Sequence, residues 1–249
     1  MNTQSVAAAQ GQEHWTHKGD VKLFLFEKQA TVKPVRGTVL FIHGSSMAST
    51  PTFDLQVPGR PYSSAMDYFA AQGYDTWCFD MEGYGRSDKT RPINCDIANG
   101  ADDAKAATDY IMKTRGIKSF HVYGISSGAL RAAMFAERHP ERVARLALDA
   151  FVWTGEGSMP TGTYVDMCSK LPVVSPEKIT VPTMVMRGQF DGIASFEDLV
   201  KFFERLPNPD KQFTVMAGIS HASFQQINYM QVYHILLSFF SQPAPLYRG

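Results

Sequence analysis

The sequence predicts an α/β fold in which helices cover both faces of a mostly parallel central sheet. Short apolar runs alternate with longer amphipathic segments along most of the chain, and this alternation is typical of repeated βα units. The chain has 249 residues, of which 44% are hydrophobic, so it can bury one large core. We therefore expect residues 1–249 to form a single domain.

Each expected strand is a short apolar run that ends in turn-forming residues. The second, for example, ends at His43 and Gly44, and the third ends at Asp80, ahead of a glycine-rich turn. In chain order, the expected strands cover residues 21–27, 38–42, 76–80, 120–123, 145–151, 183–187 and 212–216.

The segments between these strands have a helical period. The one that ends near Gly116 carries alanines together with Tyr110 and Ile111 at helical spacing. The expected helices cover residues 63–72, 102–114, 129–138, 196–206 and 223–240. Right-handed crossovers between parallel strands would place all the loops that follow the strands at one edge of the sheet.

Composition and charge favour a small molecule as the partner. Lys and Arg together number 24, as do Asp and Glu, so no net field attracts nucleic acid or an anionic membrane. The N-terminal segment lacks the basic start and apolar run of a signal peptide, and no stretch approaches the roughly 18 apolar residues of a spanning helix. We expect a cytoplasmic protein. The oligomeric state stays open, because the apolar final helix could pair with a second copy.

The sequence gives no sign of a metal or a cofactor. The three cysteines, Cys78, Cys95 and Cys168, are odd in number and scattered, which fits neither a disulfide framework nor a tetrahedral metal site. Neither an HExxH motif nor a glycine-rich loop with a following lysine is present.

The run Gly124-Ile125-Ser126-Ser127-Gly128 connects an apolar strand to an alanine-rich helix. A serine hydroxyl becomes a useful nucleophile only when a sharp turn presents it to a base and to donors for an oxyanion. Glycines two residues before and after the serine permit such a turn. Ser126 is therefore the candidate nucleophile.

Two further polar residues follow later strands, Asp191 after strand 183–187 and His221 after strand 212–216. With this GxSxG turn and the order Ser, Asp, His, the chain resembles the α/β-hydrolase superfamily from about residue 21 to residue 240. Further matches are the His-Gly pair after strand 38–42 and the DxxGxGxSD pattern that begins at Asp80. The resemblance implies a catalytic triad of Ser126, Asp191 and His221.

The identity of the acid and the base can be argued further within this resemblance. Only His221 and His234 follow Asp191 in the sequence, and His234 lies inside a helical pattern. Asp149, which ends an apolar strand, is the alternative acid, because some members carry the acid on that strand. We prefer Asp191, which lies thirty residues before His221 in a strand-exit loop.

The resemblance also implies the chemistry. The backbone N–H groups of Ser45 and Ser127 would form the oxyanion hole, and His43 would hold the loop backbone. Hydrolysis of a carboxylic ester of a small, mainly apolar substrate through an acyl-enzyme is the leading expectation. Amide, lactone, thioester or carbon–carbon bond hydrolysis, or a cofactor-free lyase or peroxidase reaction, could use the same triad, and a non-catalytic ligand receptor is the remaining class.

The substrate pocket is harder to derive from the sequence. Met47, Trp153, Phe190 and Phe224 are the candidate pocket residues because each lies near an expected site loop. Many members insert a helical cap after the strand that here ends near Phe151, whereas this chain leaves room for only a short cap or lid at about residues 152–178. Either the lid is minimal and the cleft open, or a cap is missing from the chain, which a mass above 27.7 kDa would reveal.

Overall fold

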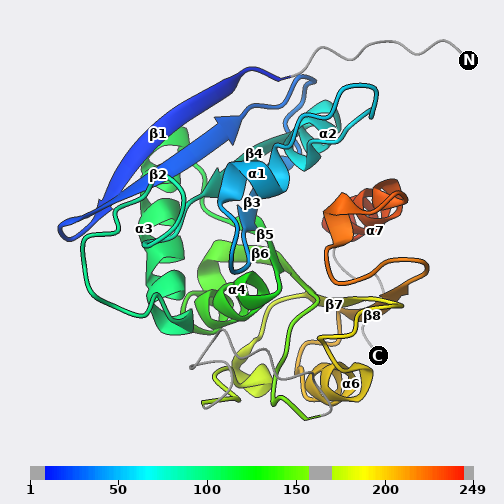
Figure 1. The fold of residues 1–249 in the computed structure, drawn as a ribbon. Coiled ribbons are helices and arrows are strands. Elements are labelled where there is room, and N and C mark those ends of the chain that lie inside the picture. Colours follow the sequence, from blue (N-terminus) through cyan, green and yellow to red (C-terminus); the bar gives the residue numbers. More distant parts are fainter. Residues whose placement is uncertain (1–8, 157–169, 244–249) are drawn as a thin grey trace, which may run out of the picture.

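A computed structural model describes residues 9–156 and 170–243. Its centre is an eight-stranded sheet with the order β1-β2-β4-β3-β5-β6-β7-β8 (Figure 1). Every neighbouring pair from β4 to β8 is parallel, and only the pairs β1–β2 and β2–β4 are antiparallel. The predicted α/β fold is confirmed. The strands are β1 (Gly11–Lys18), β2 (Val21–Lys28), β3 (Gly37–Ile42), β4 (Tyr74–Phe79), β5 (Phe120–Ile125), β6 (Val143–Asp149), β7 (Thr183–Gly188) and β8 (Lys211–Met216).

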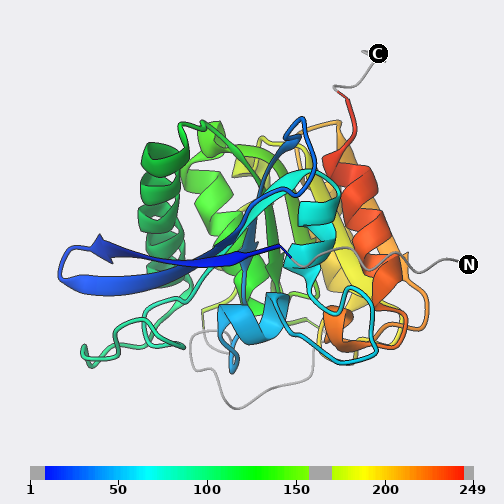
Figure 2. The ribbon, with the colours of Figure 1, turned by 90° about the horizontal axis from the view of Figure 1, so that it is seen from above.

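Helices cover both faces of the sheet, as Figures 1 and 2 show from two directions. The side chains of β3 alternate: Leu40 and Ile42 join the core cluster under α3, α4 and α6, whereas Val39 and Phe41 join the cluster under α1, α2 and α7. Both faces of this central strand are therefore buried, as its continuous apolar sequence requires. The helices are α1 (Ser49–Phe53), α2 (Ala65–Ala71), α3 (Ile97–Arg115), α4 (Ser127–Arg138), α6 (Phe196–Glu204) and α7 (Tyr229–Phe240), with 3₁₀ turns at Pro140–Arg142, Pro176–Lys178 and Ser223–Gln225.

Strand β1 was not expected from the sequence. It pairs with β2 at the edge of the sheet, and its side chains are mostly exposed or half-buried. His14 explains why this polar segment forms a strand, since its Nε2 lies 3.0 Å from Glu27 Oε2 and its Nδ1 lies 3.1 Å from the Tyr110 hydroxyl. Edge strands often lack the apolar alternation that marks a strand in a sequence.

Two helices begin at places other than those expected. Helix α3 begins at Ile97, five residues early, because the side chain of Asp96 caps it by accepting from the Asn99 N–H at 2.8 Å. Helix α7 begins at Tyr229 rather than at residue 223, since residues 223–225 form a separate 3₁₀ turn. Helix α1 is a single short turn and was not expected.

The part of the expected lid at residues 157–169 lies outside the described residues. Its two flanks are tied together, because the Trp153 indole donates to the Val174 carbonyl at 3.0 Å. Within residues 9–156 and 170–243, no helix is both long and apolar enough to cross a bilayer.

Candidate active site

Ser126 lies on a sharp turn between β5 and α4. Its backbone has φ +56° and ψ −129°, and a non-glycine residue with positive φ carries backbone strain. The Ser126 N–H donates to the Asp149 carbonyl at 2.8 Å, which fastens the turn to strand β6. The turn therefore holds the hydroxyl clear of the sheet, at the edge where the strands end.

The two glycines of this turn are required by close packing. A Cβ on Gly124 would lie 2.4 Å from the Gly128 carbonyl oxygen, and a Cβ on Gly128 would lie 2.4 Å from the carbonyl oxygens of both Ile42 and His43. These neighbours are backbone atoms of α4, of the end of β3 and of the residue that follows β3, and they cannot move aside independently. The GxSxG pattern thus allows α4 to pack tightly against the central strands.

Replacing Gly128 by alanine should destabilise the protein by about 3 kcal/mol, because the new methyl group meets two backbone carbonyls in a packed core. Denaturant titration would measure the change in the free energy of unfolding. Gly192→Ala is the matched control, since a Cβ there has no atom within 4 Å. An equal stability of the two variants would contradict the packing argument.

Loops after β7 and β8 bring an acid and a base to the serine. His221 Nε2 lies 3.1 Å from Ser126 Oγ, and His221 Nδ1 lies 3.1 Å from Asp191 Oδ2. A carboxylate can only accept, so the Nδ1–H donates to Asp191 and leaves Nε2 free to accept the serine proton. The structure thus brings together the three residues that the sequence singled out.

Asp191 is held in its charged form. Burial alone would raise the pKa of Asp191. The hydrogen bond and the charge of His221, together with the N–H groups of Ala194 and Ile193, outweigh burial, so the pKa of Asp191 is lowered. Those N–H groups donate to Oδ1 at 3.0 and 2.8 Å. The carboxylate is therefore ionised and fixed in position beside the imidazole.

Asp149, the alternative acid, has other partners. It is fully buried at the end of β6, and its Oδ2 accepts a hydrogen bond from the Tyr123 hydroxyl at 2.7 Å. Burial raises the pKa of Asp149 to about 7, although Tyr123 and Ser223 oppose the shift. The geometry pairs His221 with Asp191, and Asp149 lies behind the site.

The raised pKa of Asp149 gives the free energy of unfolding a pH dependence. Between its ordinary pKa of 3.8 and about 7, the native state binds more protons than the unfolded state. Stability from this group is therefore complete at low pH and is lost as the pH rises to about 7. Relative to wild type, Asp149→Asn should gain on the order of 2–4 kcal/mol between pH 4 and pH 8. Urea titration at each pH tests this, and a constant difference would contradict it.

The expected oxyanion donors lie on either side of Ser126. Ser127 is the first residue of α4, where N–H groups have no partner within the helix. On the other side, His43 Nδ1–H donates to the Gly44 carbonyl at 2.7 Å and Nε2 accepts from the Met81 N–H at 3.2 Å. Burial lowers the pKa of His43 to about 4, so the ring is neutral. Because the peptide is planar, the bonded Gly44 carbonyl turns the Ser45 N–H away from the His43 ring.

The DxxGxGxSD motif has a structural role here. Asp80 Oδ1 accepts from the N–H and the hydroxyl of Ser49, and Asp80 Oδ2 accepts from the Arg86 N–H. Gly85 makes room for this carboxylate, because a Cβ at that position would lie 2.0 Å from Asp80 Oδ2. The motif therefore fixes the loop after β4 against α1, next to the site loops.

The four candidate pocket residues separate into two pairs. Met47 and Phe190 lie on the surface, 43% and 68% exposed, on the loops that carry Ser45 and Asp191. Trp153 and Phe224 are instead 3% and 5% exposed and belong to the hydrophobic core. Trp153 packs on Phe202 of α6, so its ring contributes to the core and not to an exposed pocket wall.

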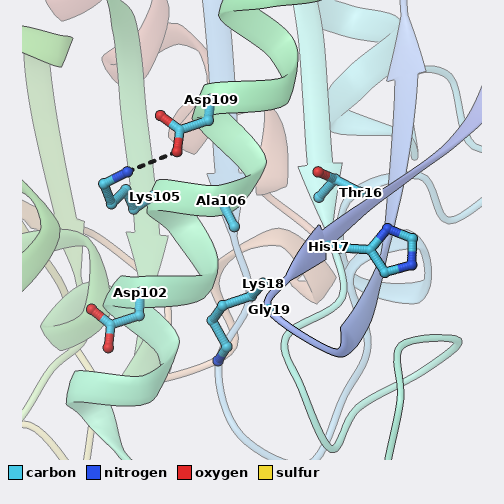
Figure 3. A pocket seen from close by; sticks show the side chains of 8 residues that line it. All are labelled: Thr16, His17, Lys18, Gly19, Asp102, Lys105, Ala106 and Asp109. Carbon is cyan, nitrogen blue, oxygen red and sulfur yellow. Dashed lines mark hydrogen bonds and ion pairs between the residues drawn. The ribbon is translucent and has the colours of Figure 1, made fainter.

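One cavity in the described part of the chain lies elsewhere. It has a volume of about 430 Å³ and lies between the β1–β2 hairpin and α3 (Figure 3). Its wall is formed by Thr16, His17, Lys18, Gly19, Asp102, Lys105, Ala106 and Asp109. Its charged groups are paired with one another or with neighbours, such as Lys105 with Asp109 and Lys18 with Asp103. No member of the candidate triad lines it.

The chain is similar in sequence to a family model for the alpha/beta hydrolase fold and to a curated hydrolase. The alpha/beta hydrolase fold family matches residues 37–160. A 2-hydroxy-6-oxononadienedioate/2-hydroxy-6-oxononatrienedioate hydrolase from Paraburkholderia phymatum is 30% identical over 192 residues, which cover 71% of this chain and 63% of the relative. The chain thus spans less than two thirds of this curated relative.

Solved structures share the fold at low sequence identity. An esterase from Pyrococcus furiosus superposes with a TM-score of 0.73 at 16% identity, over 93% of this chain and 91% of that one. A 2-hydroxy-6-oxo-6-phenylhexa-2,4-dienoate hydrolase from a Rhodococcus strain gives 0.72 at 14% identity, over 94% and 100%. These two structures show that the chain has the α/β-hydrolase fold, and the family match over residues 37–160 supports its place in the α/β-hydrolase superfamily.

Proposed function

We propose that this protein is a serine hydrolase that cleaves a carboxylic ester of a small, mainly apolar substrate through an acyl-enzyme. The observation that carries the proposal is the continuous chain of contacts from Ser126 Oγ through His221 to Asp191, with distances of 3.1 Å at both links. A non-catalytic receptor would have no need for this alignment or for the strained backbone of Ser126.

In the proposed first step, Ser126 Oγ attacks the ester carbonyl while His221 Nε2 takes its proton. The imidazolium then gives that proton to the leaving alkoxide, and the charge of Asp191 stabilises the imidazolium throughout. Water attacks the acyl-enzyme in the second step, with His221 again as the base. In both steps the N–H groups of Ser45 and Ser127 would donate to the tetrahedral oxyanion.

A second candidate is hydrolysis of a carbon–carbon bond next to a ketone. The curated relative is named as a hydrolase of oxo-dienedioates, and a ketone carbonyl accepts the same attack by Ser126 as an ester does. The exposed apolar side chains of Met47 and Phe190 on the site loops favour the apolar ester over a doubly charged substrate.

Two measurements test the proposal. The protein is incubated with p-nitrophenyl esters of graded chain length, and separately with a fluorophosphonate probe whose adduct is located by peptide mapping. We expect turnover of short and medium esters and a single adduct on Ser126. If folded protein shows neither ester turnover nor labelling, the proposal of a serine hydrolase is contradicted. Labelling without ester turnover would favour the oxo-dienoate as substrate.

A further inference from the structure

A buried arginine lies behind the two expected oxyanion donors. Arg131 is on α4, one turn after Ser127, and only 3% of it is exposed. Its Nη1 donates to Ser127 Oγ and its Nη2 to the Cys95 carbonyl, each at 3.1 Å, and its Nε has no hydrogen-bond partner within the described residues. All these partners are neutral. A buried cation with no carboxylate partner in the described part of the chain is costly and calls for an explanation.

The hydrogen bonds of Arg131 determine which hydroxyl donates and which accepts between Ser127 and Ser45. A guanidinium can only donate, so Ser127 Oγ accepts from Arg131. Ser127 is fully buried, and Ser45 Oγ, 2.7 Å away, is the acceptor that the described residues offer to its hydroxyl proton. Once Ser45 Oγ accepts from Ser127, the proton of Ser45 is free to point elsewhere.

Ser45 is half-buried and follows Gly44, whose backbone lies against the nucleophile. A Cβ on Gly44 would be 3.1 Å from Ser126 Cβ and 3.7 Å from Ser126 Oγ. The Ser45 hydroxyl therefore lies on the loop that forms one wall of the expected oxyanion hole.

We propose that the side-chain hydroxyl of Ser45 is a third donor to the oxyanion, held in the donating orientation by Arg131 through Ser127. Ser45 would touch the reacting oxygen and is thus catalytic, whereas Ser127 Oγ and Arg131 are positioning groups. No covalent bond is made or broken along this series of hydrogen bonds, since each hydroxyl keeps its proton. This inference rests on the proposed function.

The positive charge of Arg131 would also stabilise the oxyanion directly. It lies near the N-terminus of α4, where the helix dipole is also positive, and the two fields add at the place where negative charge develops. Arg131 also contributes to lowering the pKa of His43 on the same loop, although burial is the larger cause. A preorganised cation in a site shielded from water stabilises an oxyanion without reorganisation during the reaction.

The first test compares Ser45→Ala with Ser45→Thr in the full-length protein, using a p-nitrophenyl ester that wild type hydrolyses. Ser45→Ala should lower kcat about 10- to 100-fold and change KM less than about threefold, because the hydroxyl acts on the oxyanion alone. Ser45→Thr keeps the hydroxyl and should recover most of the rate. An unchanged kcat in Ser45→Ala would overturn the proposal.

The second test is a double-mutant cycle. Arg131→Met and Ser127→Ala should each lower kcat about tenfold when Ser45 is present, and by less than about twofold in the Ser45→Ala background. A merely structural role would lower kcat equally in both backgrounds. If Arg131→Met fails to fold, the same comparison is made with Ser127→Ala alone. Arg138→Met, on an exposed arginine of the same helix, is the matched control.

The two proposals fail in different ways. Wild type without ester turnover or labelling would overturn the serine hydrolase itself. Wild type with turnover, combined with equal effects of Arg131→Met in the two backgrounds, would overturn only the role of the hydroxyl chain.

Discussion

Replacing Ser126 by alanine is expected to lower kcat for a p-nitrophenyl ester by about 10⁶-fold. The acyl-enzyme cannot form without the hydroxyl, and only the oxyanion donors and substrate binding would remain to accelerate direct attack by water. The fluorophosphonate adduct should disappear at the same time. Burst and steady-state kinetics would measure the loss.

The fold is expected to tolerate this change, because Ser126 is half-buried and, among the described residues, its hydroxyl hydrogen-bonds to the His221 ring alone. Ser241→Ala, at the C-terminal end of α7, is the control for loss of a serine hydroxyl away from the site. Retention of more than a tenth of wild-type kcat by Ser126→Ala would exclude Ser126 as the nucleophile.

Replacing Asp191 by asparagine is expected to lower kcat by about 10⁴-fold. An amide at position 191 can donate to His221 Nδ1, which favours the tautomer with the proton on Nε2. That tautomer cannot accept the proton of Ser126. Measuring kcat of Asp191→Asn over a range of pH would show whether a higher pH recovers any of the lost rate.

Asp149→Asn is the matched control, because it makes the same change in a carboxyl that bonds Tyr123 instead of His221. Its kcat should stay within about tenfold of wild type. The reverse outcome, with a large loss in Asp149→Asn and a small one in Asp191→Asn, would assign the acid to strand β6.

The fold and the core of the site were predictable because both depend on local patterns. Apolar runs marked the buried strands, and the glycines around Ser126 marked a turn that packing then requires. The parallel topology then predicts that the loops after separate strands meet at one edge of the sheet. His221 and Asp191 could therefore be placed near Ser126 without knowledge of any distance.

Other features depend on contacts that no local pattern encodes. Strand β1 is polar and is held by pairing with β2 and by His14. Trp153 reads as a loop aromatic, yet it packs on Phe202 in the core. Arg131 was missed because an arginine inside an alanine-rich helix normally faces solvent, and only the packing of α4 shows that it is buried beside Ser127.

The position of β8 has a consequence for how activity would be lost under mild denaturation. This strand is at the edge of the sheet, and most of its residues are only half-buried, whereas β5 is central and almost fully buried. Strands with few buried contacts open at lower free energy than the core. The nucleophile thus belongs to the most protected part of the molecule and the base follows one of the least protected. Fraying at β8 would release His221 while Ser126 is still held in its native turn.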